Sequence, residues 1–230
     1  MKRKPRVAIM TPIRHGTVHH EFASSLAATM RAIRDWDLAW FTTIGCSILP
    51  DARSMCVAQA LAWGADKLVF IDDDISWTVQ DFVFLCAHKQ KAVTGYYCTR
   101  KSNSDDPTCI TVQFKDDNRT TDESGLMEVR GAGFGFIRFD REIFDKLEPL
   151  CARMYDNALP PDVNNCYSDW FPYGLTYSEE KKAYHRAGED IQFCHRIAEL
   201  GYPLFLDPKI QLGHHAGAEC FRADITKLAA

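Results

Sequence analysis

Three consecutive carboxylates, Asp72, Asp73 and Asp74, follow a run of four apolar residues at 68–71. Such a run predicts a strand buried on both faces, which would end in charge only where it emerges at a site. Because side chains alternate along a strand, we expect Asp72 and Asp74 to point the same way and Asp73 to point opposite. Two crowded carboxylates repel each other unless a cation lies beside them, and oxygen ligands favour a hard divalent ion. The spacing therefore predicts an Asp-X-Asp metal and nucleotide site.

Two further groups of residues offer related chemistry later in the chain. Glu189 and Asp190 begin a predicted helix, and His214 and His215 follow a predicted late strand. Each group also has a structural explanation, because the helix dipole favours acids in a first turn and a histidine after a strand is more often a surface or core residue than a ligand. Their order and spacing relative to the aspartates favour a functional interpretation.

The first 74 residues have the pattern of a parallel sheet with helical crossovers. Apolar spacing predicts strands at 6–10, 38–44 and 68–71, alternating with helices at 18–33 and 52–63, the second ended by Gly64. Strands and helices that alternate in this way are typical of doubly wound α/β folds. Ligands bind at the carboxyl ends of strands in such sheets, and both Thr11-Pro12 and the three aspartates lie at such ends.

The second half of the chain predicts a less regular set of elements. We expect helices at 80–88, 142–147 and 189–200, and strands at 91–97, 109–114, 128–139, 203–206 and 210–212. The glycines at 131, 133 and 135 indicate tight turns and a close backbone approach, either to another strand or to a ligand. Residues 149–182 are irregular and aromatic, so Trp170 and Phe171 are interpreted either as plain core or as a lid that stacks on an acceptor.

Composition sets limits on the class of protein. A chain of 230 residues with 46% hydrophobic residues can bury a sizeable core, and its net charge of −4 gives no overall basic surface for nucleic acid. The sequence has neither the apolar stretch of a signal peptide nor a membrane span, which favours a soluble, intracellular protein. Nine scattered cysteines without a Cys-X-X-Cys pair are expected to be free thiols in a reducing cytosol.

An ordered set of motifs carries a resemblance to a known family. The set comprises Asp51-Ala-Arg-Ser-Met, Ile71-Asp-Asp-Asp-Ile, Gly131-Ala-Gly-Phe-Gly-Phe, Gly188-Glu-Asp-Ile-Gln-Phe-Cys and Gly213-His-His. It resembles the nucleotide-sugar glycosyltransferases of the GT-A fold, especially the small inverting type of family 2 found in bacteria and phages. The resemblance implies one α/β glycosyltransferase domain over 1–230, with a mostly parallel sheet, flanking helices and a smaller antiparallel portion. The expected domain divides into a nucleotide-binding half at 6–98, an acceptor-side half at 99–217 and a tail at 218–230.

The resemblance also implies a metal site that holds the donor. Asp72 matches the first aspartate of the family motif, which contacts the ribose or the metal, and Asp74 matches the second, which binds the cation. Asp73 is placed with the donor-binding residues and is expected to tolerate substitution best. His214 matches a histidine that completes the metal shell, but His215 is equally placed by sequence. An imidazole ligand favours Mn²⁺ over Mg²⁺.

Further site residues follow from the same resemblance. Asp190 matches the catalytic base, with Glu189 as its neighbour or an acceptor-binding group. Thr11, Pro12 and Arg53 fall where the family holds the nucleotide, and Gly133 lies where the donor or acceptor passes close to backbone. The chain departs from the family at Gln192, where many relatives have an acid, and at Ser54, where Asn is frequent.

These features predict a metal-dependent hexosyl- or pentosyltransferase that moves a sugar from a nucleotide diphosphate sugar to an acceptor hydroxyl. A UDP-sugar is the favoured donor. A nucleotidyltransferase is an alternative, although the loop at 11–17 has one glycine and no lysine for a triphosphate. A non-catalytic nucleotide-sugar or glycan binding module is another. The acceptor is left open between a glycan, a small molecule and modified phage DNA, and the expected location is the cytoplasm, the host's if the chain is phage-encoded.

Overall fold

The computed structural model describes residues 3–99, 110–115, 119–156, 165–217 and 219–222. Its helices are α1 (His20–Ala32), α2 (Leu49–Trp63), α3 (Val79–Ala87), α4 (Arg141–Leu147) and α5 (Glu189–Glu199), with a 3₁₀ turn η2 (Glu148–Leu150). The strands of the central sheet are β1 (Arg6–Ile13), β2 (Asp37–Ile44), β3 (Lys67–Ile71), β5 (Ala92–Tyr96), β6 (Val112–Phe114), β7 (Met127–Ala132), β8 (Phe136–Asp140) and β13 (Leu204–Gln211). Smaller sheets contain β4 (Ile75–Ser76), β9 (Arg153–Tyr155), β10 (Cys166–Ser168), β11 (Gly174–Ser178), β12 (Ala183–Ala187), β14 (Gly213–Ala216) and β15 (Glu219–Phe221).

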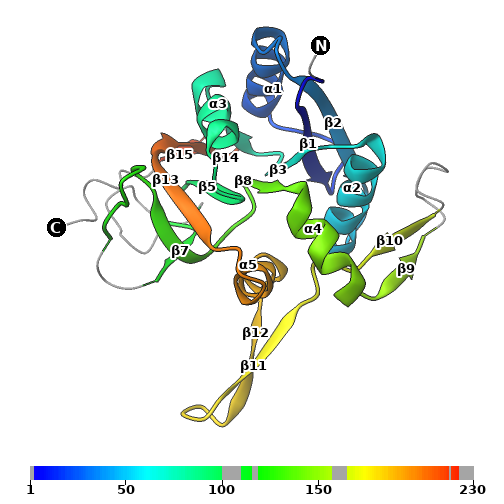
Figure 1. The fold of residues 1–230 in the computed structure, drawn as a ribbon, viewed down its shortest axis with the longest axis vertical. Helices are drawn as coiled ribbons and strands as arrows, with labels where there is room; N and C mark the ends of the chain where they lie inside the picture. The colour runs from blue at the N-terminus through cyan, green and yellow to red at the C-terminus, as the bar shows by residue number, and fades with distance from the viewer. Residues whose placement is uncertain (1–2, 100–109, 116–118, 157–164, 218, 223–230) are drawn as a thin grey trace.

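The central sheet has the order β2-β1-β3-β8-β5-β13-β7-β6 (Figure 1). Strands β1, β2 and β3 pair in parallel, and so do β5 and β13, whereas β8 is inserted antiparallel between β3 and β5. Of the eight described strands in this sheet, only β7 and β8 therefore run against the rest. The predicted class of fold is confirmed: this is an α/β structure with a mostly parallel central sheet, flanking helices and smaller antiparallel sheets beside it.

Alternation along the inner strands creates a core on each face of the sheet. Val7 and Ile9 of β1 join one cluster, which α1 and α3 cover, while Ala8 and Met10 join the other, which α2, α4 and α5 cover. All four side chains are almost completely buried. The near-continuous apolar runs that predicted these strands thus reflect burial on both faces.

The two predicted halves of the chain share this one sheet. β8 belongs to the acceptor-side half at 99–217, yet it pairs with β3 and β5 of the nucleotide-binding half. The predicted tail at 218–230 begins with β15, which pairs with β14. Residue 218 and residues 223–230 lie outside the described part of the chain. Among the described residues, no helix combines the length and the apolar character that a membrane crossing requires.

Two predicted strand boundaries are wrong. Thr11 and Pro12 do not end β1, because the strand continues to Ile13 and both residues stay in register with β2. Proline is tolerated at this position because its ring replaces only a backbone donor near the end of the strand. The two short strands predicted at 203–206 and 210–212 form a single strand, β13, with an irregular register between Leu206 and Gln211.

One cysteine corrects the expectation that all nine are free thiols. Cys98, just after β5, is disulfide-bonded, and its partner lies outside the described residues. The seven other described cysteines are free. Sequence spacing did not indicate this bridge because the two half-cystines belong to no recognisable pair motif.

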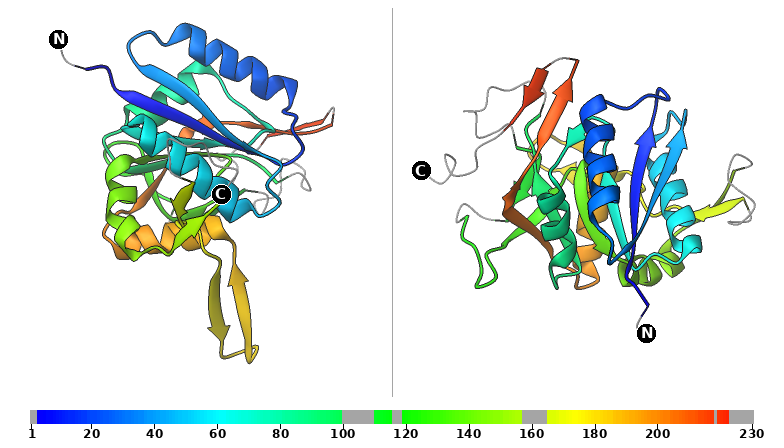
Figure 2. Two further views of the ribbon diagram at one scale, coloured as in Figure 1. Left: turned by 90° about the vertical axis from the view of Figure 1, so that its right-hand side faces the viewer. Right: turned by 90° about the horizontal axis from the view of Figure 1, so that it is seen from above.

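The aromatic segment predicted to be irregular contains two hairpins and a piece of core. β9 pairs with β10, and β11 pairs with β12 in a hairpin that projects away from the body of the molecule (Figures 1 and 2). Trp170 and Phe171 are 2% and 0% exposed, so the expectation of an acceptor lid at these residues is not met. Phe171 instead packs against Phe70 and Phe193, with ring centroids 5.5 and 4.7 Å away.

This packing predicts a large loss of stability in Phe171→Ala. Truncation of a fully buried phenylalanine leaves a cavity and costs about 3–5 kcal/mol in the free energy of unfolding. Urea denaturation measures this quantity, with Tyr173→Ala as a half-exposed control expected to change it by about 0.5 kcal/mol or less. A Phe171→Ala variant as stable as the control would contradict the core assignment.

Candidate active site

The three aspartates lie in a turn that directly follows β3. The strand ends at Ile71, and the turn is closed by the amide of Ile75, which donates to the carbonyl of Asp72 at 3.2 Å. All three carboxylate residues line one cavity of about 270 Å³. Asp73 therefore lies at the same cavity as Asp72 and Asp74, and that its side chain points opposite to theirs stays a prediction.

The described residues that line this cavity come from four elements. Pro12 lies near the end of β1, and Arg14 lies just after it. Cys46 and Ser47 lie between β2 and α2. Leu49 begins α2, and Arg53 lies in its second turn. The carboxyl ends of β1, β2 and β3 thus meet at the cavity, as expected for a parallel sheet. Pro12 and Arg53 were predicted at this site. The residues after β2 were not predicted there, because their position after a strand is the one feature of the sequence that indicates them.

Thr11 is fully buried beneath the cavity. Its hydroxyl accepts a hydrogen bond from Trp40 Nε1 at 3.1 Å, so it ties β1 to β2. This contact gives Thr11 a supporting role behind the wall of the cavity. Its neighbour Pro12 is the residue of the pair that lines the space.

Asp74 and His214 face each other across the turn. His214 Nε2 lies 3.4 Å from Asp74 Oδ2, and both side chains are largely buried. The other ring nitrogen, Nδ1, lies 2.6 Å from the carbonyl oxygen of Cys98, which can only accept, so Nδ1 carries the proton. Nε2 is therefore the ring nitrogen of His214 that faces the carboxylate of Asp74.

His215 lies on the opposite side of β14 from His214. Its Nε2 is 2.8 Å from Ser76 Oγ, and its Nδ1 is 3.6 Å from Glu21 Oε1 on α1. Burial lowers the pKa of this imidazole, against the opposing effect of Glu21. The sequence could not distinguish the two histidines, but alternation along β14 does so in the structure. Only His214 points toward the aspartates.

A glycine makes the contact of His215 with Ser76 possible. A Cβ on Gly213 would lie 2.5 Å from Ser76 Oγ and 3.1 Å from His215 Nε2. The amide of His215 also donates to the carbonyl of Asp74 at 2.9 Å. β14 is therefore fixed against the aspartate turn by both its backbone and its second histidine.

Arg53 connects the aspartate turn to the acidic pair on α5. Its Nη1 donates to Glu189 Oε1 at 2.7 Å, and its Nη2 lies 3.6 Å from Asp72 Oδ1. The guanidinium is buried, with the rings of Phe134 and Phe70 at 4.9 and 5.9 Å from its central carbon. Arg53 Nε has no hydrogen-bond acceptor among the described residues. Burial of such a cation is tolerated because carboxylates and aromatic faces surround it.

The same contact separates the roles of Glu189 and Asp190. Glu189 is buried and committed to Arg53, so it is an unsuitable proton acceptor. Asp190 is partly exposed at the first turn of α5, where its Oδ1 accepts from the amide of Ile191 at 2.7 Å. Of the two acids, Asp190 is the one available as a base.

The glycine-rich turn after β7 packs against a tyrosine. A Cβ on Gly133 would lie 2.6 Å from Tyr97 Oη, and one on Gly135 would lie 2.5 Å from the same ring. The amide of Gly135 donates to Tyr97 Oη at 3.0 Å. Burial and the charge of Asp72 raise the pKa of this buried phenol. The close approach that the glycines predicted is therefore to a side chain of the protein itself, one that sequence analysis did not single out.

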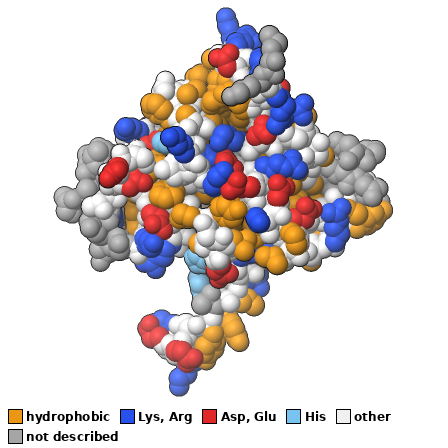
Figure 3. Space-filling model, viewed as in Figure 1, with side chains coloured by type: hydrophobic (Ala, Val, Ile, Leu, Met, Phe, Trp, Pro, Cys, Tyr) orange, Lys and Arg blue, Asp and Glu red, His pale blue; other side chains and the backbone are white. Residues whose placement is uncertain are grey.

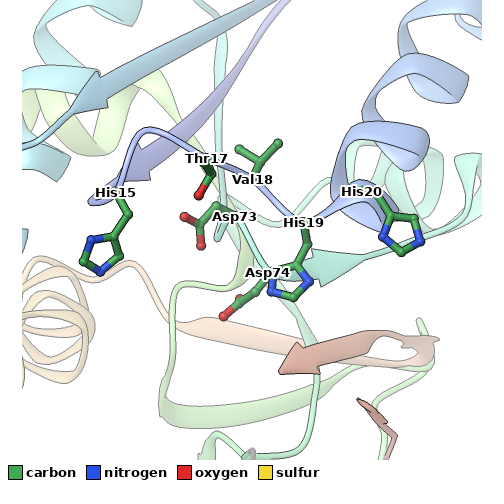
Figure 4. A pocket seen from close by; sticks show the side chains of 7 residues that line it. All are labelled: His15, Thr17, Val18, His19, His20, Asp73 and Asp74. Carbon is green, nitrogen blue, oxygen red and sulfur yellow. The ribbon is translucent and has the colours of Figure 1, made fainter. Parts of the chain in front are cut away.

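A second cavity, of about 440 Å³, adjoins the aspartate turn (Figure 4). Asp73 and Asp74 lie between His15 on one side and His19 on the other, and His20, Thr17 and Val18 complete the lining. These histidines lie in the loop before α1 or at the start of α1 and were not predicted as site residues. Among the residues that the structure describes, three or more metal-ligating side chains do not converge on one point. A bound metal would therefore need ligands from a substrate or water as well.

Comparisons with known proteins report on the fold. No family model matches the chain, and no curated protein matches it. The crystal structure of A197 from STIV is similar with a TM-score of 0.53 and 14% identity, and the match covers 95% of this chain and 94% of that one. A likeness at this identity concerns the fold alone.

Two further solved structures are similar over less of their length. One is the catalytic domain of Drosophila β1,4-galactosyltransferase 7 in complex with xylobiose, at TM-score 0.46 and 13% identity over 88% of this chain and 65% of that one. The other is a glycosyltransferase involved in the glycosylation of the major capsid of PBCV-1, at TM-score 0.36 and 11% identity over 62% and 63%.

The buried ion pair predicts a specific pattern of stability. Arg53→Met or Glu189→Met alone leaves an uncompensated buried charge and should cost about 3–5 kcal/mol in the free energy of unfolding. The double variant removes both charges and should recover much of that loss. Urea denaturation of the four proteins gives the coupling energy. Additive losses in the double variant would show that the two residues do not depend on each other.

Proposed function

We propose that this chain is a metal-dependent glycosyltransferase that moves a sugar from a nucleotide diphosphate sugar to an acceptor hydroxyl. The donor that we favour is a UDP-sugar, and the transfer inverts the configuration of the anomeric carbon. The observation that carries the proposal is the position of Arg53, which contacts both Asp72 in the aspartate turn and Glu189 beside Asp190. Groups suited to hold a nucleotide diphosphate and a group suited to act as base therefore lie around one buried cation. A nucleotide-sugar binder would have no need for that base.

The donor set around Asp74 fits a divalent cation. Asp74 supplies a carboxylate and His214 an imidazole nitrogen, Nε2, which lies 3.4 Å from Asp74 Oδ2. Mg²⁺ and Mn²⁺ are commonly held by one or two protein ligands together with substrate phosphates, and an imidazole favours Mn²⁺. When bound, the metal supplies a Lewis acid for the charge on the departing diphosphate.

Side chains of the protein would bind the donor and accept the proton of the acceptor. Arg14 and Arg53 bring positive charge to the cavity that receives the donor, and Asp72 faces the same space. Asp190 accepts the proton of the acceptor hydroxyl as that hydroxyl attacks the anomeric carbon, which contributes about 100- to 10,000-fold to the rate. A carboxylate that acts as base rather than as nucleophile gives one displacement, and therefore inversion at that carbon.

The first prediction from this proposal concerns Asp74. Asp74→Asn should abolish nucleotide release from a panel of nucleotide sugars assayed with Mn²⁺, and EDTA should do the same to the unmodified protein, because both remove the cation. Asp145→Asn, an exposed change on α4, serves as the control and should release nucleotide normally. Full turnover in the presence of EDTA would exclude the metal-dependent mechanism.

A second prediction separates the two histidines. His214→Ala should raise the Mn²⁺ concentration required for half-maximal nucleotide release, because it removes a proposed ligand. His215→Ala should instead lower the free energy of unfolding by about 1–3 kcal/mol, because it removes the hydrogen-bond partner of Ser76 and one of the partners of Glu21. Mn²⁺ titrations and urea denaturation of both variants measure these effects. The reverse pattern would assign the metal to His215.

A further inference from the structure

The hairpin of β11 and β12 is poorly explained as part of the fold. Its strands pair with each other and project from the body beside α5 (Figures 1 and 2). A two-stranded hairpin contributes little stability by itself, and an arm of this kind exposes costly apolar surface. Leu175, Tyr177 and Tyr184 are 65%, 45% and 71% exposed. Such exposure is retained where the surface has a ligand or a partner.

The register places the apolar side chains on one face of the hairpin. Tyr177 pairs directly with Tyr184, and Leu175 pairs with Arg186, so these four share a face. The rings of Tyr177 and Tyr184 are 5.1 Å apart, and the guanidinium of Arg186 lies 5.6 Å from the ring of Tyr173. The opposite face carries Ser178, Ala183 and His185 instead. We call the first set, with Tyr173, the aromatic face of the arm.

The arm is joined directly to the proposed catalytic helix. β12 ends at Ala187, and only Gly188 and Glu189 separate it from Asp190. At the base of the arm, a side chain on Gly174 would collide with Gln192 of α5. A molecule that lies along the arm therefore reaches the end of α5 at which the acceptor hydroxyl is deprotonated. Alternate residues on one strand are roughly 6.6–6.8 Å apart, so the aromatic face is an extended surface.

We propose that the aromatic face of the arm binds an oligosaccharide acceptor and guides its end toward Asp190; this inference rests on the proposed function. The C–H faces of sugar rings stack on tyrosine rings, while the tyrosine hydroxyls and Arg186 offer hydrogen bonds to sugar hydroxyls. A small acceptor would not reach the exposed end of the arm. The substrate class is therefore a glycan of several units.

Charge argues against a nucleic acid on the same surface. Single-stranded nucleic acid also stacks on aromatic side chains, but it requires a basic groove along its backbone. The tip of the arm carries Glu179 and Glu180 beside Lys181 and Lys182, and both signs are visible at the end of the hairpin in Figure 3. Lys181 is already 2.6 Å from Glu180. A neutral, hydroxyl-rich ligand fits this mixed charge better than a polyanion does.

The test compares the unmodified protein with Tyr177→Ala/Tyr184→Ala, using cello-, xylo- and chito-oligosaccharides of one to six units. Binding is measured by the fluorescence anisotropy of oligosaccharides that carry a fluorescent label at the reducing end, and transfer by nucleotide release with each unlabelled acceptor. At least one series should bind the unmodified protein more tightly as its length grows. The variant should bind its hexasaccharide about tenfold more weakly, which corresponds to about 1.4 kcal/mol. Affinity for the monosaccharide should not change, because one sugar unit does not span the two tyrosines.

A matched control is Ala183→Ser/His185→Gln, which alters the opposite face of the same hairpin and should leave hexasaccharide binding unchanged. Equal loss in both variants, or no binding by any series, overturns the inference. Tighter binding of an oligo(dT) probe than of any glycan, or a dimer that becomes monomeric in the tyrosine variant by light scattering, also overturns it in favour of another occupant. Absence of nucleotide release from every donor contradicts the proposed function, while the fluorescence titration still decides whether the arm binds glycans.

Discussion

The buried guanidinium of Arg53 lies between aromatic rings, so its charge must be neutralised by carboxylates. The arrangement of this site depends on that pairing. The charge of Arg53 is shared between Glu189 at 2.7 Å and Asp72 at 3.6 Å, two carboxylates that are far apart in sequence. Loss of either partner leaves an expensive buried charge, so the end of β3 and the start of α5 are held in a fixed relation. The proposed donor site and the proposed base are therefore positioned by one cation.

The antiparallel strand β8 makes this contact possible. β8 lies antiparallel between β3 and β5, and the turn that precedes it brings Phe134 over Arg53. The same turn contains Gly133 and Gly135, which leave room for the ring of Tyr97. Core packing and site geometry are thus continuous here: the aromatic cluster that stabilises one face of the sheet also forms the low-dielectric surroundings of the ion pair.

Much of this fold follows from sequence periodicity, and the errors have physical causes. The buried strands and α2 with its Gly64 cap were predictable because apolar runs and a left-handed glycine are local signals. The end of β3 at the three aspartates was predicted, but the side-chain alternation of a strand does not extend into the turn that follows it, so it could not place Asp73. Glu189 could not be recognised as an ion-pair partner, since its contact with Arg53 spans 136 positions. Trp170 and Phe171 gave no local sign of their burial, and the pairing of β11 with β12 was hidden by irregular composition.

A crystal structure of the protein with UDP and Mn²⁺ tests the central claim most directly. The account predicts that Asp74 and His214 would hold Mn²⁺ and that the nucleotide would lie in the cavity beside Arg53. The Arg53–Glu189 ion pair should persist in that complex. Density for the metal beside His215 instead, or a nucleotide bound away from the aspartate turn, would contradict the account.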